Sequence, residues 1–409
     1  MLIERQQCGQ MDAKDPLAPV RDSFALPAGV IYLDGNSLGA LPRSVPERLA
    51  HTVTHEWGEH LIRSWNTAGW ASLPRTVGDR LAKLIGAEPG SVVVCESTSV
   101  NLYKVMMAAA AMRPGRRVVL TDAGNFPTDI YVMSGVAAQM GLELEVAEPE
   151  RVVDSIRADV AVMALTQVDY RTGRRHDMAE LTRRAHQAGA IVVWDLAHSA
   201  GAFAVDLAGC EVDLAVGCGY KYLNGGPGAP AFVYVAPRLQ DGFANPIRGW
   251  FGHSRPFDFD LEFHPADGID RARVGTPHVL SMVALDEALG VFDGLDMAAV
   301  RSKSVALTDL FISLIDDRLP GVFELATPRE PQLRGSQVSL RHPDAYRVVQ
   351  ALIDRGVIGD FRTPDVARFG FAPLYVRHVD VWDAVDVLVD VIRTESWRQP
   401  RYAIRNAVT

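Results

Sequence analysis

The sequence predicts an α/β protein, with a large domain on a mainly parallel sheet of the seven-stranded type and a smaller α+β domain after it. Two observations support this fold class. Between residues 90 and 235, short β-branched runs alternate with helical stretches, as in the crossover units of a parallel sheet. Beyond residue 275, long amphipathic stretches are followed by shorter strand-like pieces, which indicates a second domain of mixed structure.

The strands expected in the large domain are apolar along their whole length. Helices cover both faces of a parallel sheet, so such strands do not alternate between apolar and polar residues. The runs are SVVVCES, RRVVLTDAG, ADVAVMALTQVD, AIVVWDLAHSAGA, VDLAVGCGYKY and APAFVYVAP. In the small domain, MVALDEALGVFDGL and VALTDLFISLIDDRL are expected to be helices, and GSQVSLRH and ARFGFAP to be strands.

The chain is predicted to have three parts. Residues 1–66 contain no strand series and are expected to pack as an arm and helix on the small domain. Residues 67–275 form the large domain and residues 276–409 the small one. A chain of 409 residues, 48% of them hydrophobic, is long enough for two cores, since single cores stop growing near ~250 to 300 residues.

Composition argues against several classes of partner. The formal net charge of −9 arises from charges of both signs spread along the chain, with no basic block that could neutralise nucleic acid or anionic lipid. The first residues, MLIERQQCGQMDAKD, resemble neither a signal peptide nor a transit sequence. No apolar stretch approaches the ~20 residues that span a bilayer. We therefore expect a cytoplasmic protein that binds neither nucleic acid nor membrane.

The four cysteines show no motif that predicts a disulfide framework or a metal site. Cys8, Cys95, Cys210 and Cys218 are neither densely spaced nor arranged as C-x-x-C. Because cysteine packs as a small apolar residue, we expect four free and buried thiols.

The most informative segment is DLAVGCGYKYLNGGPG, in which Lys221 follows an apolar strand and precedes a glycine-rich turn. An amine in that position is partly desolvated, which favours the neutral, nucleophilic form that Schiff-base chemistry requires. The glycines allow the backbone to approach a ligand closely. A solvated lysine at the end of a strand is the alternative, so the interpretation depends on the neighbouring segments.

A second polar segment follows the strand IVVWD, which ends at Asp195, with His198 three residues later. Ligands of open α/β sheets lie beyond the carboxyl ends of the strands. A carboxylate there can pair with the protonated ring nitrogen of pyridoxal 5′-phosphate (PLP) and keep the ring electron-withdrawing. Asp195 and His198 could instead be two metal ligands, although no further ligand with fitting spacing is nearby and we predict no metal. His198 could also be an ordinary hydrogen-bonded core histidine.

Two further loops offer groups that suit a phosphorylated ring. In CESTSVNL, Thr98 or Ser99 is expected to cap a helix whose first amides could face a phosphate, or simply to cap it without a ligand. In NFPTD, Phe126 offers a flat face to a cofactor ring, with the carboxylate of Asp129 beside it. Taken alone, NFPTD is also compatible with an ordinary turn.

These segments, in this order, resemble those of kynureninases, which belong to the class V branch of the aspartate-aminotransferase fold, fold type I of the PLP-dependent transferases. The likeness extends over nearly the whole chain, and WDLAHS and GWFGH are its most specific parts. One departure is Gly219, where a threonine or a similar residue is expected before the Tyr-Lys pair; its absence is expected to loosen packing around the lysine. The matching motifs are YLDGNSLG, LIRSW, NFPTD, WDLAHSAG, YKYLNGGPG, GWFGH, GTP, GVIGDFR and RFGFAPLY.

The resemblance implies a PLP-dependent hydrolase that cleaves the Cβ–Cγ bond of L-kynurenine to anthranilate and L-alanine. It implies a place in tryptophan catabolism and NAD biosynthesis, with 3-hydroxykynurenine as a second possible substrate, and a homodimer. Lys221 would hold the cofactor and act as the catalytic base, Asp195 would pair with the pyridinium, and Phe126 would stack on the ring. Asp129 and His198 would line the other edge of the cofactor.

The resemblance also assigns the phosphate cup and the substrate pocket. Thr98, Ser99 and Tyr220 would hold the phosphate, and Tyr220 is also a candidate proton carrier. Trp250 and Thr276 would complete the cup, from this chain or from a partner subunit. Arg368 would bind the α-carboxylate of the substrate as a bidentate clamp. Trp65 and His253 are candidates for the aryl-ketone pocket.

Three rival functions are considered. A cysteine desulfurase has the same fold and lysine but needs a nucleophilic thiolate in the second half of the chain, and every cysteine here precedes Lys221. An aminotransferase would accumulate pyridoxamine phosphate. A non-catalytic binder would be marked by loss of the lysine or the aspartate, and both are present.

Overall fold

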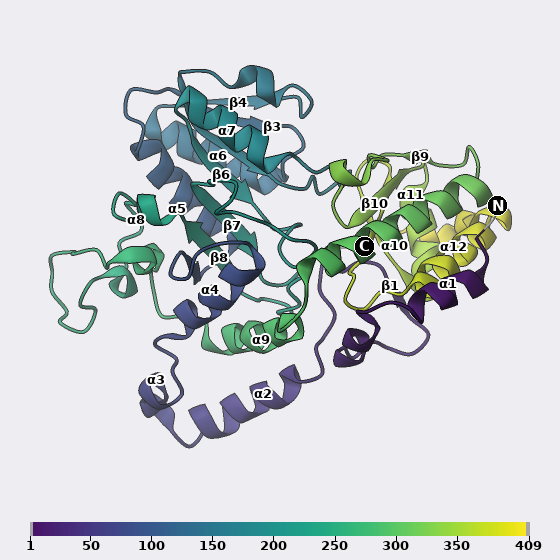
Figure 1. Ribbon diagram of the computed structural model, residues 1–409, viewed down its shortest axis with the longest axis horizontal. Helices are drawn as coiled ribbons and strands as arrows, with labels where there is room; N and C mark the ends of the chain where they lie inside the picture. Colours follow the sequence, from purple (N-terminus) through teal and green to yellow (C-terminus); the bar gives the residue numbers. More distant parts are fainter. Residues whose placement is uncertain (1–2, 406–409) are drawn as a thin grey trace.

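Seven strands form one central sheet in the computed structural model, which describes residues 3–405 (Figure 1). The strand order is β2-β8-β7-β6-β5-β3-β4. Only β8 runs against its neighbours, which confirms the predicted mainly parallel sheet. The strands are β2 (Val92–Val94), β3 (Val118–Asp122), β4 (Glu143–Ala147), β5 (Val160–Thr166), β6 (Ile191–Asp195), β7 (Leu214–Cys218) and β8 (Ala231–Val235).

Helices cover both faces of this sheet, and each strand contributes side chains to the cores on both faces. Successive strand residues point to opposite faces. On β6, Ile191 and Val193 belong to the core with α5 and α6, whereas Val192 and Trp194 belong to the core with α4 and α7. This two-sided burial explains the unbroken apolar runs. The helices are α4 (Leu73–Leu84), α5 (Thr98–Ala111), α6 (Pro127–Met140) and α7 (Met178–Ala188).

Local signals in the sequence fix the ends of these helices. The Asp177 side chain accepts a hydrogen bond from the backbone N–H of Glu180 and caps α7, which ends at Gly189 with φ 79°. Helix α6 begins at Pro127 and is terminated after Met140 by Gly141, which has φ 66°. The first turn of α6 therefore starts at a defined point beyond the carboxyl end of β3.

The small domain is built on a four-stranded sheet with the order β12-β13-β10-β9 and antiparallel pairing throughout. Long helices pack against it, so the predicted α+β domain is confirmed (Figure 1). Its elements are α10 (Met297–Arg318), β9 (Glu324–Leu325), β10 (Gln337–Arg341), α11 (Ala345–Ile353), β12 (Asp360–Arg362), β13 (Val366–Gly370) and α12 (His378–Arg393).

The N-terminal segment contacts both lobes. Helix α1 (Arg5–Asp12) packs on α12, where the Asp12 carboxylate accepts hydrogen bonds from two N–H groups at the start of that helix. Strand β1 (Ile31–Tyr32) pairs in parallel with β11 (Val357–Ile358). Helix α2 (Val45–His51) packs on α9 (Val279–Leu289), and α3 (Ser64–Thr67) and α8 (Pro237–Gln240) are single turns. The three-part division with its boundaries remains a proposal, and its ends at residues 1–2 and 406–409 lie outside the described residues.

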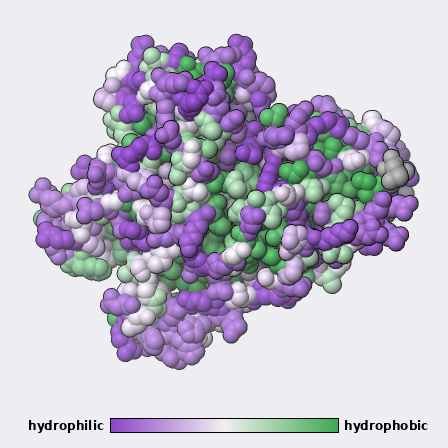
Figure 2. Space-filling model, viewed as in Figure 1, coloured by the Kyte–Doolittle hydropathy of each residue, from purple (hydrophilic) through white to green (hydrophobic). Residues whose placement is uncertain are grey.

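The surface is mostly hydrophilic on the face shown in Figure 2, and apolar side chains gather in the recess between the two lobes. None of the helices in the described part of the chain combines the length and apolar character that a membrane span requires.

All four cysteines are free. Cys8, Cys95 and Cys218 are buried as predicted, but the prediction is wrong for Cys210, which is half-buried.

Two glycines let the chain pack tightly around the loop that carries Lys221. A Cβ at Gly219 would lie 2.6 Å from the Pro230 carbonyl oxygen and 3.0 Å from Leu285. Packing there is tight, so the expectation that Gly219 loosens it is wrong. A Cβ at Gly39 would lie 2.3 Å from the Lys221 carbonyl oxygen, while the Gly39 N–H donates to the carbonyl of Tyr220 at 2.8 Å.

Replacing Gly39 by alanine should therefore destabilise the protein. The added methyl group collides with backbone, which cannot move aside as a flexible side chain can, so we expect a loss of about 1 to 3 kcal/mol in the free energy of unfolding. Urea unfolding monitored by circular dichroism measures this loss. Gly135→Ala is the matched control, because a Cβ on that helical glycine meets no atom within 4 Å. The Gly135 variant should be unchanged or slightly more stable.

Candidate active site

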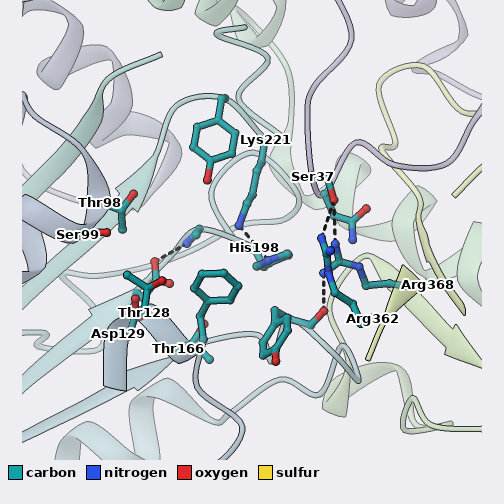
Figure 3. A pocket seen from close by; sticks show the side chains of 16 residues that line it. Ser37, Thr98, Ser99, Thr128, Asp129, Thr166, His198, Lys221, Arg362 and Arg368 are labelled. Carbon is teal, nitrogen blue, oxygen red and sulfur yellow. Dashed lines mark hydrogen bonds between the residues drawn. The ribbon is translucent and has the colours of Figure 1, made fainter. Parts of the chain in front are cut away.

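A cavity of about 210 Å³ lies where the two lobes meet (Figure 3). The large domain contributes the carboxyl ends of β5, β6 and β7, because parallel strands bring these ends to one edge of the sheet. The small domain contributes side chains of β12 and β13 from the opposite side. The cavity is lined by Asn36, Ser37, Thr98, Ser99, Phe126, Thr128, Asp129, Thr166, Tyr170, Asp195, Ala197, His198, Tyr220, Lys221, Arg362 and Arg368.

The amine of Lys221 points into this cavity and lies 3.0 Å from Nε2 of His198 (Figure 3). Burial and the neighbouring Lys221 charge hold the pKa of His198 well below its usual range. The imidazole is therefore neutral and can accept a hydrogen bond from the amine. This contact fixes the position of the nucleophilic nitrogen.

Two carboxyl groups, Asp129 and Asp195, share the floor of the cavity and are both buried. Burial first, and then the charge of Asp195, raise the pKa of Asp129 well above its usual range. Burial also raises the pKa of Asp195, but the charge of Lys221 and the Ala197 N–H, which Asp195 accepts at 2.8 Å, oppose this shift. Asp195 is therefore the better candidate for the charged member of the pair.

The start of α5 forms another wall. Thr98 and Ser99 line the cavity, but the prediction that one of them caps the helix is wrong. Ser97 is the N-cap, since its side chain accepts from the N–H of Val100, which leaves the next two hydroxyls free to face the cavity. Further along α5, the buried Lys104 ammonium donates to the Ala272 carbonyl at 2.8 Å.

Aromatic side chains supply the remaining wall. Phe126 is 43% exposed and contacts the Tyr170 ring edge-on at 5.1 Å, so its position at the cavity is set by a neighbouring ring. Burial raises the pKa of Tyr220, whose phenol therefore keeps its proton near neutral pH. Phe126 gives the cavity an apolar face, and Tyr220 gives it a hydrogen-bond donor.

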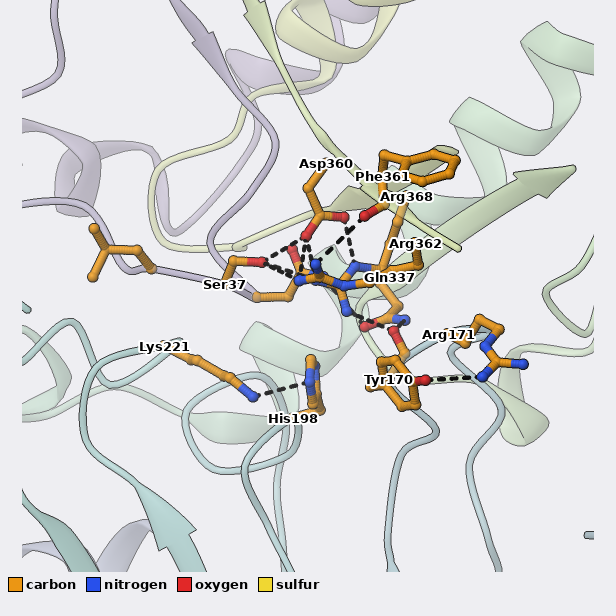
Figure 4. Close-up of polar contacts among 12 residues, drawn as sticks. Ser37, Tyr170, Arg171, His198, Lys221, Gln337, Asp360, Phe361, Arg362 and Arg368 are labelled. Carbon is orange, nitrogen blue, oxygen red and sulfur yellow. Dashed lines mark hydrogen bonds and ion pairs between the residues drawn. The ribbon is translucent and has the colours of Figure 1, made fainter. Parts of the chain in front are cut away.

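On the small-domain side, Arg368 is buried and paired with Asp360 (Figure 4). Its Nε donates to Asp360 at 2.8 Å, and its other nitrogens donate to Asp360, the Tyr170 carbonyl and the Ser37 hydroxyl. Arg368 does reach the cavity as predicted, but its forked edge is already engaged by a protein carboxylate. An incoming carboxylate cannot be held by that same edge.

The alternative of a metal site gains no support. Across residues 3–405, no three His, Cys, Asp or Glu side chains are grouped so that they could hold an ion. His198 instead lies 3.0 Å from the Lys221 amine, and Asp195 lines the same cavity.

Comparisons with known proteins identify the family. The family model for the kynureninase C-terminal domain matches residues 300–388. The chain is 52% identical over 413 residues to a kynureninase of Burkholderia pseudomallei, covering 99% of both chains, and 50% identical over 416 residues to one of Pseudomonas fluorescens, covering 100% of both. The chain belongs to the kynureninase family. A cysteine desulfurase of Thermococcus onnurineus NA1 shares the fold, with a TM-score of 0.78 at 20% identity over 92% of this chain and 98% of that one.

Nine of the residues predicted from the kynureninase resemblance line one cavity, although they come from five separate segments of the chain. Four others do not line the cavity of their own chain. Three of these gather around Phe251: Trp65 is 5.9 Å from its ring, Trp250 is 4.3 Å from it, and His253 follows two residues later. The nine are Thr98, Ser99, Phe126, Asp129, Asp195, His198, Tyr220, Lys221 and Arg368, and the four are Trp65, Trp250, His253 and Thr276.

His253 has a structural role within its own loop. Its Nδ1 accepts the N–H of Arg255 at 2.9 Å, and its Nε2 lies 3.1 Å from the Glu262 carbonyl. Both ring nitrogens are thus engaged by the backbone of its own loop. The imidazole holds the loop in shape within the chain.

Several lining residues were not singled out from the sequence. Asn36, Ser37 and Arg362 lie within the family motifs YLDGNSLG and GVIGDFR, so a motif signal existed for them. Thr166 ends β5 and Tyr170 lies shortly after it, and neither belongs to such a motif. Position at a strand end, as for Asp195, could have indicated Thr166.

Asp34 is a half-buried residue near the arginine pair, and one of its carboxyl oxygens is fully buried. Burial and the charge of Asp360 raise its pKa to about 7, while Arg368 and Arg362 oppose this shift. The unfolded chain ionises this group near pH 3.9. Between these two values the folded protein binds the extra proton, so stability present at low pH is lost as the pH rises towards about 7.

Asp34→Asn should remove this pH dependence. The free energy of unfolding of the variant, relative to wild type, should rise between pH 5 and pH 7 by up to about 1.4 kcal/mol per pH unit. Urea unfolding at pH 5, 6, 7 and 8 measures the difference. Asp317→Asn, at an exposed position of α10, is the control and should run parallel to wild type. Parallel profiles for Asp34→Asn as well would contradict the shifted pKa.

Proposed function

We propose that this chain catalyses the hydrolytic cleavage of the Cβ–Cγ bond of L-kynurenine to anthranilate and L-alanine, with PLP as its cofactor. The observation that carries the proposal is the meeting of Lys221 and Asp195 in one cavity whose walls also include a helix start and an arginine. An amine and a carboxylate that face separate cavities could not serve one pyridine ring. Membership of the kynureninase family specifies the reaction.

The residues of the cavity fit PLP. Lys221 would hold the aldehyde carbon, and Asp195 would hold the proton on the ring nitrogen. The free hydroxyls of Thr98 and Ser99, at the positive end of α5, would hold the phosphate. Phe126 would cover the ring. Asp129 has a buried oxygen without a hydrogen-bond partner among the described residues, so a polar ligand group would satisfy it.

Bound PLP supplies an electrophilic carbon for the substrate amine and a ring that withdraws electrons from the substrate's α-carbon. The chain moves the protons. The Lys221 amine, held 3.0 Å from the neutral imidazole of His198, takes the proton from the α-carbon. The protonated phenol of Tyr220, adjacent in sequence, donates a proton to the substrate or its product. Water then completes the hydrolysis of the carbon–carbon bond at the γ-carbonyl.

Lys221→Ala should abolish both cofactor attachment and turnover. Without the amine there is no covalent link, so the visible absorption band of lysine-bound PLP should disappear. Release of the fluorescent aryl amine from L-kynurenine and from 3-hydroxykynurenine should fall to background. Lys83→Ala, which removes an exposed lysine from α4, should keep both signals.

The same assay compares the rival functions. Wild-type enzyme that releases no aryl amine from either substrate would contradict the proposed function. Accumulation of pyridoxamine phosphate with a keto-acid acceptor would favour an aminotransferase instead. The ratio of the two turnover rates gives the preference between the substrates.

We also propose a homodimer in which Trp250 and Thr276 of one subunit complete the phosphate site of the other. Both are exposed in the single chain. The loop after Trp250 carries unusually exposed apolar side chains, with Phe257 at 65%, Phe259 at 73% and Leu261 at 103% of full exposure. A group of large apolar residues on a surface loop is typical of an interface with another chain. Trp65 and His253, packed beside this loop, would approach the partner's aryl pocket in the same way.

Complementation between two inactive variants tests this sharing. Lys221→Ala and a double variant Trp250→Ala/Thr276→Ala should each be inactive as homodimers. Mixing them under conditions that exchange subunits should restore up to about a quarter of wild-type activity, since half of the dimers are mixed and each has one intact site. The control mixes Lys221→Ala with Asp195→Ala. Both residues line the same cavity of one chain, so this mixture should restore no activity.

Cellular context follows from the proposed chemistry. Four free thiols are compatible with a reducing compartment, so we propose the cytoplasm. Cleavage of kynurenine places the enzyme in tryptophan catabolism, and cleavage of 3-hydroxykynurenine would place it in NAD biosynthesis.

A further inference from the structure

A second cleft, of about 420 Å³, lies between the lobes and shares no lining residue with the cavity around Lys221. The large domain contributes residues 175–177, which lead into α7, and the small domain contributes α10 and the turn Pro331–Leu333. The backbone joins these parts, since the Arg175 N–H donates to the Leu333 carbonyl at 2.8 Å. The second cleft therefore lies at a junction of the two lobes.

Two arginines line this second cleft, one from each lobe, and both contact the same aromatic ring. The guanidinium carbon of Arg175 is 5.0 Å from the centre of the Phe203 ring, and that of Arg301 is 5.4 Å from it. Phe203 is buried, so the ring is a fixed surface for both side chains. An aromatic face attracts a cation but carries no net charge. Two like charges are thus held near each other without being neutralised by the ring.

Both arginines have donors left for a ligand. Among residues 3–405, the Arg175 side chain makes no hydrogen bond or ion pair, and none of its nitrogens is a sealed interior atom, so its five N–H donors remain available. Arg301 is partly engaged, but its Nε is free and also accessible. The terminal nitrogens of Arg301 donate to three backbone carbonyls, those of Pro331, Arg334 and Gly335.

No carboxylate within the described residues pairs with either arginine. Asp177 lines the cleft and is exposed, but its side chain caps α7 and forms no ion pair with Arg175. Asp309 is ion-paired with Arg334 instead. Burial first, and then the charges of Arg175 and Arg334, lower the pKa of Arg301 to about 10, and burial lowers the pKa of Arg175. Arg301 therefore keeps its charge at neutral pH without a counter-charge.

We propose that this second cleft binds a small ligand with a doubly charged oxyanion of the phosphate class, held between Arg175 and Arg301. Two guanidiniums match a phosphate group in charge, and their planar N–H edges match its oxygens. Val305 and Leu333 also line the cleft and contact the organic part of such a ligand. Because one arginine comes from each lobe, the bound anion links the lobes outside the cavity around Lys221.

The test uses the holoenzyme with inorganic phosphate as the probe, because bound PLP keeps its own phosphate site occupied. The midpoint of thermal unfolding is measured against phosphate concentration, with sodium chloride and sodium acetate at matched ionic strength as controls. Phosphate should raise the midpoint by about 2 to 5 °C at saturation, since a ligand that binds only the folded state stabilises it. Chloride and acetate should raise it much less.

Arg175→Gln should raise the half-saturating phosphate concentration by about 10- to 100-fold, because charged hydrogen bonds are lost. Without phosphate, its midpoint should equal or exceed that of wild type, since the change removes the repulsion of Arg301. Arg175→Lys keeps the charge but not the fork; it should give an intermediate loss and serves if the glutamine variant does not fold. Arg174→Gln is the matched control and should respond as wild type does. Arg174 is the neighbouring residue, pairs with Glu150 and does not line the cleft.

Three results would overturn the inference. The first is a wild-type midpoint that phosphate does not raise. The second is an equal rise with chloride or acetate, which would indicate screening of charges instead of a bound dianion. The third is an unchanged half-saturating concentration in Arg175→Gln, which would place the anion elsewhere on the protein. All three measurements use only the folded holoenzyme, so they are independent of whether it cleaves kynurenine.

Discussion

The site depends on the desolvation of charged groups where two lobes meet. An ionised side chain loses the stabilisation of water when it is buried, so each buried charge in the cavity needs a neighbour of opposite charge or must give up its ionisation. Lys221 stands against the carboxyl pair of Asp129 and Asp195 on one side, and Asp360 stands between two arginines on the other. Groups of opposite charge therefore face one another on both sides of the cavity.

The parallel sheet explains why these charges can be brought together. Asp195 ends β6 and Lys221 follows β7, and these strands pair in parallel, so both residues emerge at the same edge. The lobe that supplies the arginines is tied to this edge by the Arg368 bond to the Tyr170 carbonyl. The distance between Lys221 and the two arginines is therefore set by contacts between the lobes.

Much of this arrangement could be predicted from the sequence, for identifiable reasons. Unbroken apolar runs predict buried parallel strands, and a charged residue directly after such a run, such as Asp195, must lie at the strand end. The sequence predicts the N-cap one or two residues late, because Ser97, Thr98 and Ser99 all carry a hydroxyl that can cap a helix and only backbone geometry distinguishes them. The partnership of Arg368 with Asp360 was not predicted, because which donors of a guanidinium remain free depends on neighbours that the sequence does not place. The tightness at Gly219 depends on Pro230 and Leu285, which also come from elsewhere in the fold.

The buried ammonium of Lys104 joins two regions that otherwise have separate tasks. It lies on α5, whose first turn faces the cavity, and it holds the carbonyl of Ala272, which leads into the segment that ends at the exposed Thr276. A displacement of that segment would act on α5 through one buried hydrogen bond. The cavity wall at Thr98 and Ser99 and the surface near Thr276 are therefore parts of one mechanical unit.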